Sequence, residues 1–237
     1  MGYALTIEEI KGVIESEVQS RSGEVTDWFS DDERLFLRAV LPPVSPVLPD
    51  DRMKPGVAAH LHGGLLEVRP YVFRLVCENG AIMAQSGAAS EVALADHPKP
   101  EDLKEQILVA VSRSLSEEAA KTSFDLIRDS KTRRADLAIT MMTMFRRFGH
   151  PSSRIVMDVL QRFSSEGDPS SFGLMQALTS LARDTPDPDT KWRLEEIGGG
   201  VPARLEDPIR TSSEAAEWPE MFDEIDLMPR QERLVKR

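Results

Sequence analysis

Apolar and polar side chains alternate most regularly in residues 71–85, which is the pattern of a β-strand with one face toward a core. The core-facing positions run from Tyr71 to Cys77 at every second residue. Asn79-Gly80 follows, and this dipeptide favours the positive φ angles of a two-residue hairpin turn. The segment therefore predicts a β-hairpin.

Two further segments of the first half also predict strands. Residues 34–41 alternate in the same way, and residues 57–70 predict two short strands or one bent strand broken at Gly63-Gly64. The proline-rich residues 42–51 cannot form a helix or a central strand, so we expect a loop there. Together these segments predict a small antiparallel β-sheet.

The rest of the chain has apolar residues at helical spacing, with capping residues and prolines at the expected helix starts. This pattern predicts helices over residues 6–20, 100–129, 133–148, 152–164, 168–183 and a short one from Asp187-Pro188 to Gly198-Gly199-Gly200. The predicted fold class is therefore α+β, with the small antiparallel β-sheet of the first half packed with a helical second half. We expect residues 1–33 to form an acidic helix and turn, 34–200 a single domain, and 201–237 a flexible acidic tail.

Composition is that of a globular protein, with 41% hydrophobic and 29% charged residues, which argues against general disorder. A single cysteine excludes an intramolecular disulfide and fits a reducing compartment. The sequence has no secretory signal pattern and no apolar stretch of membrane-spanning length. We expect a cytoplasmic protein without a membrane partner.

The net charge of −11 comes from the two ends of the chain, because residues 34–205 hold equal numbers of acids and bases. Within this balanced part, residues 128–165 hold eight bases and three acids. A local basic zone attracts phosphate even in an acidic protein, and a solvated helix face is the alternative. The predicted nucleic-acid-binding residues are Arg133, Arg134, Arg146, Arg147, Arg154 and Arg162.

Residues 213–228 combine six acids and no base with several large apolar side chains. This composition is typical of a peptide that docks on a partner or masks a basic groove, and a loosely ordered tail is the alternative. The predicted partner-binding residues are Trp218, Phe222 and Ile225.

His60-Leu61-His62 places two imidazoles on one face of a strand, as in some metal sites, with Cys77 as a third candidate ligand. No further cluster of cysteine and histidine follows, and exposed polar positions alternating with Ala59 and Leu61 explain the pair. The apolar neighbours of Cys77 predict a buried structural thiol rather than a nucleophile. We therefore predict no metal, no cofactor and no catalytic residue, and we expect the protein not to be an enzyme.

Residues 69–83 (RPYVFRLVCENGAIM) combine an aromatic-rich strand, an Arg-hydrophobic-Val-Cys run and an Asn-Gly turn. Residues 172–199 add a helical segment in which Gln176 stands where an asparagine is expected. In these two patches the chain resembles the phage/plasmid-like proteins that share domain of unknown function 932. The resemblance spans residues 34–200 in order and implies a mobile-element protein with a DNA-related role. That family has no assigned catalytic residues, so none is transferred to this chain.

These features predict a non-enzymatic, DNA-associated protein of the strand-annealing or replication-accessory kind. We expect it to form a homo-oligomer and to bind single-stranded DNA through the arginines of residues 128–165. The alternative is a protein-interaction or scaffold module that docks a protein partner through its acidic tail. Salt dependence separates them, because binding to DNA weakens steeply as salt rises.

Deleting residues 206–237 is expected to raise affinity for single-stranded DNA if the tail masks the arginines. The deletion changes the net charge from −11 to −7 and removes a tethered competitor for the basic zone. Adding Arg146→Glu and Arg147→Glu to the deletion should cancel the gain. Fluorescence anisotropy at low salt measures the affinities, and equal affinity of the full-length and truncated proteins contradicts masking.

Overall fold

The structure is a computed structural model that describes residues 4–43, 51–83, 87–97, 99–148 and 153–203. Residues 1–203 form one compact unit. Its helices are α1 (Ile7–Ser20), α2 (Pro100–Ser114), α3 (Glu117–Ser130), α4 (Leu137–Phe148), α5 (Ser153–Glu166), α6 (Ser171–Arg183) and α7 (Pro188–Ala203), with a short 3₁₀ helix at Leu94–Asp96. Its strands are β1 (Glu24–Ser30), β2 (Leu35–Val40), β3 (Met53–His62), β4 (Leu65–Arg74), β5 (Asn79–Ile82) and β6 (Ser90–Ala93).

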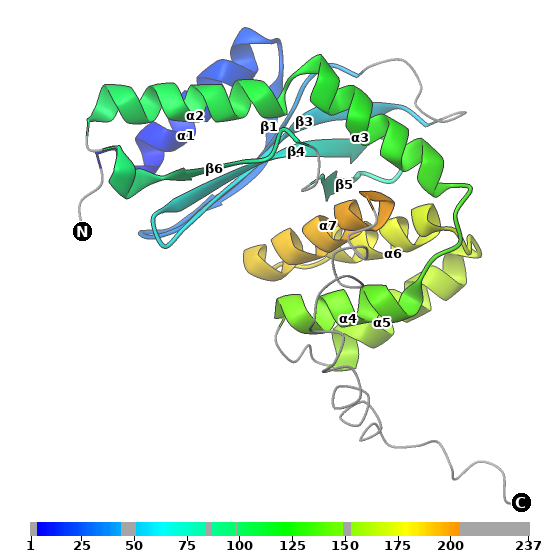
Figure 1. The fold of residues 1–237 in the computed structure, drawn as a ribbon. Coiled ribbons are helices and arrows are strands. Elements are labelled where there is room, and N and C mark those ends of the chain that lie inside the picture. Colours follow the sequence, from blue (N-terminus) through cyan, green and yellow to red (C-terminus); the bar gives the residue numbers. More distant parts are fainter. Residues whose placement is uncertain (1–3, 44–50, 84–86, 98, 149–152, 204–237) are drawn as a thin grey trace, which may run out of the picture. The chain divides into compact units, whose positions relative to one another are not determined.

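The strands form one antiparallel sheet in the order β1-β2-β3-β4-β5. Strand β4 is long enough to pair with two short strands, with β6 beside residues 65–68 and β5 beside residues 71–74. Helices dominate the chain after the sheet (Figure 1). The predicted α+β class is therefore confirmed.

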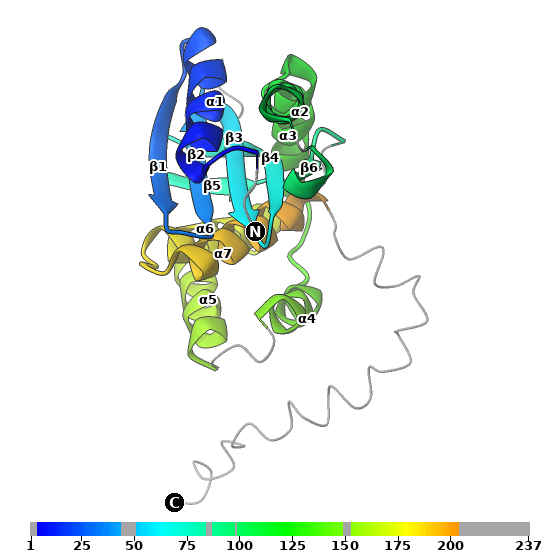
Figure 2. The ribbon, with the colours of Figure 1, turned by 90° about the vertical axis from the view of Figure 1, so that its left-hand side faces the viewer.

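Helices α1 and α2 cover one face of the sheet (Figure 2). Leu35, Leu37 and Ala39 of β2 point toward these helices and join a fully apolar core. Helix α1 begins with a capping box, in which Thr6 and Glu9 satisfy each other's backbone N–H groups. The predicted helix over residues 6–20 is confirmed, and it closes this face of the core.

The opposite face of the sheet carries Phe36, Tyr71 and Ile82, which pack against Trp192 of α7. Helices α4 to α7 share a second apolar cluster, and α3 and α6 cover the end of the sheet formed by β4 and β5. None of the helices among these described residues combines the length and the apolar character needed to cross a bilayer.

The prediction of a hairpin turn at Asn79-Gly80 is wrong. Residues 75–78 make the turn, with Glu78 at a φ of 50°, and Asn79-Gly80 already belong to β5. Gly80 is still required, because a Cβ at this position would lie 1.9 Å from the Tyr71 hydroxyl.

The break at Gly63-Gly64 is a two-residue hairpin turn between β3 and β4. Both glycines have positive φ angles, 55° and 78°, as a type I′ turn requires. His62 therefore pairs with Leu65 across the turn, and the register of two ten-residue strands follows from it.

Several predicted helix boundaries are also wrong, and α4 begins at Leu137 instead of at residue 133. The segment 100–129 is two helices, because Ser116 interrupts it and caps α3 by accepting a hydrogen bond from the backbone N–H of Ala119. Gly198-Gly199-Gly200 lie inside α7 instead of ending it. A Cβ at Gly199 would lie 2.1 Å from the backbone oxygen of Ile82, so this glycine lets α7 lie directly against β5.

Substituting Gly199→Ala is expected to lower the free energy of unfolding by about 1–3 kcal/mol, because the added methyl group overlaps the backbone of β5. Gly12→Ala is the matched control, since Gly12 is an exposed helical glycine with no atom within 4 Å of the added Cβ. We expect this control to raise stability by roughly 0.5–1 kcal/mol. Urea denaturation measures both changes, and a neutral Gly199→Ala contradicts the close packing of α7 on β5.

Candidate functional site

The sheet face that α7 covers holds charged groups, whereas the face below α1 and α2 is apolar. In β2, Arg38 alternates with Leu37 and Ala39, so it points toward α7 and is 2% exposed. In β3, His60 points the same way and is also buried. Exposed polar positions do not explain His60, and the sequence interpretation of the histidine pair is wrong in this respect.

Arg38 forms an ion pair with Glu195 of α7, in which the Arg38 Nε and the Glu195 Oε2 are 2.6 Å apart. Both side chains are 3% exposed. Burial raises the pKa of the Glu195 carboxyl, and the attraction of Arg38 opposes that rise. Asp27 of β1 lies 3.4 Å from the Arg38 Nη1 and also pairs with Lys191, which extends the network to the edge strand.

A cleft of about 390 Å³ adjoins this network. Its lining comes from β1, β2, β4, β5, α6 and α7 and includes three basic groups and three acidic groups: Arg38, Arg183, Lys191, Asp27, Glu78 and Glu195. Tyr71, Phe73 and Asn79 add two aromatic rings and an amide. Burial raises the pKa of Tyr71 well above its ordinary value, so its hydroxyl stays protonated.

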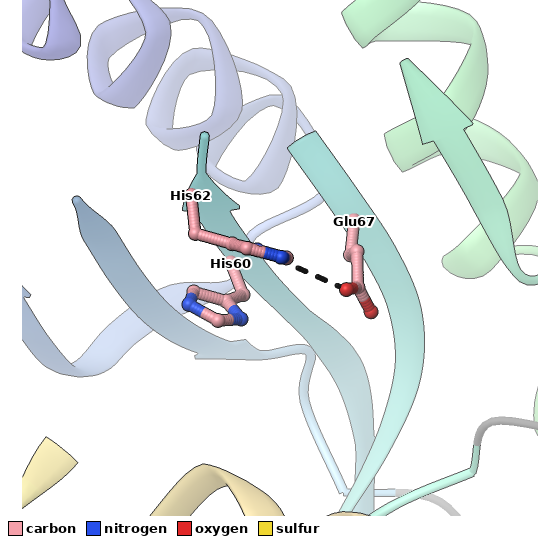
Figure 3. Close-up of side chains that lie close together, drawn as sticks. All are labelled: His60, His62 and Glu67. Carbon is pink, nitrogen blue, oxygen red and sulfur yellow. Dashed lines mark ion pairs between the residues drawn. The ribbon is translucent and has the colours of Figure 1, made fainter. Parts of the chain in front are cut away.

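His60, His62 and Glu67 lie together near the β3–β4 hairpin turn (Figure 3). The register pairs His60 with Glu67, and His62 is two residues further along the same face of β3. One ligand atom from each of the three side chains lies within 4.8 Å of the others. Sequence reasoning missed Glu67, although a two-residue turn at Gly63-Gly64 would have placed it opposite His60.

The His60 imidazole stacks on the rings of Phe36 and His62, and the ring of Trp192 lies beside it at a tilt. Its ring centroid is 4.2 Å from that of Phe36, 4.5 Å from that of His62 and 5.0 Å from that of Trp192. Burial, with His62 as a second cause, lowers the pKa of His60 to about 4. The Nε2 atom of His60 is buried and has no hydrogen-bond partner among the described residues.

Arg69 holds the Glu67 carboxylate in a fixed orientation. The Arg69 Nη2 donates to the Glu67 Oε2 at 2.9 Å and to the Glu91 Oε1 at 3.1 Å. The other oxygen of Glu67, Oε1, lies 3.9 Å from the Nδ1 of His62. Glu67 and Glu91 carry two negative charges and Arg69 carries one positive charge, so this group of three has a net charge of −1.

Cys77 does not join the histidines, because it lies at the opposite end of β4, in the turn after Arg74. It is half-buried, so the prediction of a buried thiol is wrong. Its Sγ lies 3.6 Å from the Arg74 Nη1, and its backbone carbonyl accepts a hydrogen bond from the Arg183 Nη1 at 2.7 Å. The arginines therefore fix the turn between β4 and β5.

The arginines predicted to bind nucleic acid occupy different environments. Arg133 donates from Nη2 to the backbone carbonyl of Pro202 at 2.5 Å, which stabilises the last turn of α7. The Arg162 Nη1 lies 2.9 Å from the Asp184 Oδ2. Arg134, Arg146 and Arg154 are exposed. The side chain of Arg147 lies outside the described residues, and so do the tail residues Trp218, Phe222 and Ile225.

Comparison of the chain with protein-family models, curated proteins and solved structures gives no match.

Arg38→Met is expected to lower the free energy of unfolding by about 3–5 kcal/mol, because it leaves the Glu195 carboxylate buried without its partner. The double variant Arg38→Met/Glu195→Leu should lose much less than the sum of the single changes. Chemical denaturation of the complete double-mutant cycle measures the coupling.

The control for that cycle is Arg128→Met, since Arg128 and Asp125 form an ion pair on the surface of α3. We expect it to change stability by less than about 1 kcal/mol. Additive effects of Arg38→Met and Glu195→Leu would show that the buried pair does not act as a unit.

Proposed function

We propose that the protein associates with single-stranded DNA, with arginines of the helical half on the phosphates and the cleft receiving an unstacked base. The observation that carries the proposal is a chain of polar contacts from α5 to the cleft. Arg162 of α5 contacts Asp184, and Asp184 contacts Arg183, which lines the cleft. These contacts link α5, which carries Arg154 and Arg162, to a residue that lines the cleft.

The balance of charges in the cleft favours a base over a phosphate group. Its three basic and three acidic groups cancel, so an entering phosphate would meet carboxylates as well as arginines. A base is uncharged and offers donors, acceptors and a flat face. Phe73 offers a ring for stacking, and the Asn79 Oδ1, which has no hydrogen-bond partner among the described residues, offers an acceptor. Proteins bind single strands by stacking on and hydrogen-bonding to unstacked bases.

Phosphate contacts are expected from Arg134, Arg146 and Arg154, whose side chains are exposed. Arg133 is expected to act indirectly, since its guanidinium binds the end of α7. Oligomerisation, which the sequence predicts, would repeat this surface along one strand and make binding cooperative.

The double variant Arg134→Glu/Arg154→Glu is expected to weaken binding to a labelled oligodeoxythymidine at least tenfold, because each arginine lost removes a phosphate contact. The slope of log affinity against log salt should fall by about one for each arginine lost. Fluorescence anisotropy over a series of salt concentrations measures both quantities.

Lys104→Glu/Lys121→Glu is the matched control, because it changes the net charge equally at exposed positions of α2 and α3. Equal weakening in both double variants would mean that binding reflects overall charge and not this surface. No binding of the full chain at low salt would remove the DNA function and favour the partner-docking alternative.

A further inference from the structure

The cluster at the β3–β4 hairpin has the donor set of a metal centre and plays no part in the proposed DNA association. We propose that His60, His62 and Glu67 bind one divalent transition-metal ion, for which Zn²⁺ is the best match. Two imidazoles and one carboxylate form a common three-residue ligand set of zinc sites with an open position. Among the residues that the structure describes, this is the group of three histidine, cysteine or acidic side chains whose ligand atoms lie close enough together to hold a metal ion.

The unpaired Nε2 atom of His60 is the strongest sign of a ligand. His60 is 8% exposed, and a buried imidazole nitrogen normally has a hydrogen-bond partner. Its Nε2 has none among the described residues. If the Nε2 is the ligand atom, donating its lone pair to a metal ion would satisfy it, and the rings of Phe36 and Trp192 restrict the movement of the imidazole.

Glu67 is oriented in the way that metal-binding carboxylates usually are. One oxygen, Oε2, accepts a hydrogen bond from Arg69, so the other oxygen, Oε1, remains for an ion on the side of His62 (Figure 3). Such a partner behind the ligand fixes its direction in characterised metal sites. Glu91 shares Arg69, and the net negative charge of the group attracts a cation.

The three ligand atoms have to move closer together to bind one ion. They lie within 4.8 Å of one another, whereas ligands about 2.0–2.2 Å from a tetrahedral Zn²⁺ are roughly 3.4 Å apart. His62 is the side chain that can make this adjustment, since it is 48% exposed and lies next to the two-residue turn. His60 is held by the rings of Phe36 and Trp192, and Glu67 is held by Arg69. Two of the three ligands are therefore already in position without the ion.

The donor types decide between metals. Neutral imidazole nitrogens suit Zn²⁺ and its neighbours in the first transition series, while Ca²⁺ and Mg²⁺ prefer sites made of oxygen atoms. Three protein ligands leave at least one coordination position for water or another group. The cluster therefore predicts an open site rather than a closed structural one.

Isothermal titration of the full, chelator-treated chain with zinc chloride at neutral pH tests the site. We expect one Zn²⁺ per chain, and at least tenfold weaker binding in His62→Ala and in Glu67→Gln. His62→Ala is the main variant because its side chain is half-exposed and belongs to none of the apolar clusters. His97→Ala is the matched control, because His97 lies after the 3₁₀ helix and outside the cluster.

Nitrogen-15 spectra of the imidazole rings supply a second readout. Zn²⁺ should shift the ring signals of His60 and His62 and leave that of His97 in place. Absence of Zn²⁺ binding by the full chain would overturn the proposal. So would unchanged affinity in His62→Ala, which would assign the ion to another part of the chain, such as its acidic ends. Neither result bears on the proposed DNA association, which is measured without metal.

Discussion

The buried ion pair between Arg38 and Glu195 is the constraint on which much of this fold depends. Each charge would be costly to bury alone, and each is nearly inaccessible to solvent, so the two must meet. Arg38 comes from the second strand and Glu195 from the last helix, so the pair ties opposite ends of the described chain together. It thereby fixes the position of α7 over the sheet.

Other features of the site follow from the position of α7. Trp192, one turn before Glu195, reaches both His60 and the Arg38 guanidinium, whose carbon lies 5.9 Å from the ring centroid. Gly199, one turn after Glu195, allows the helix backbone to lie against β5. The helix also contributes Lys191 and Glu195 to the cleft. One helix therefore covers both the histidine cluster and the charged cleft.

Local patterns predicted the elements whose residues alternate between a core and the other side of a helix or strand. The α+β class, the helix over residues 6–20 and the strand over residues 34–41 are of this kind. Strand β1 has no fully buried position, and its partly buried positions include Asp27 and Ser30 while Trp28 is exposed, so the hydrophobic pattern does not reveal it. The turn predicted at Asn79-Gly80 is wrong for another reason. Asn79 donates hydrogen bonds to Gln176 and Thr179, and Gly80 leaves space for Tyr71, so both residues are required by contacts with other parts of the fold and not by a turn.

Local contacts of the site can be predicted from the sequence, whereas contacts between distant segments cannot. The partnership of His60 with Glu67 is local, since a two-residue turn at Gly63-Gly64 fixes which residues face each other across β3 and β4. Arg38 and Glu195 are 157 residues apart, and the residues around one of them give no sign that the other is its partner. A charged residue at a buried strand position indicates that it has a partner but not which residue this is. Arg38 in an otherwise apolar strand is such a residue, and the structure shows that its partner, Glu195, belongs to α7.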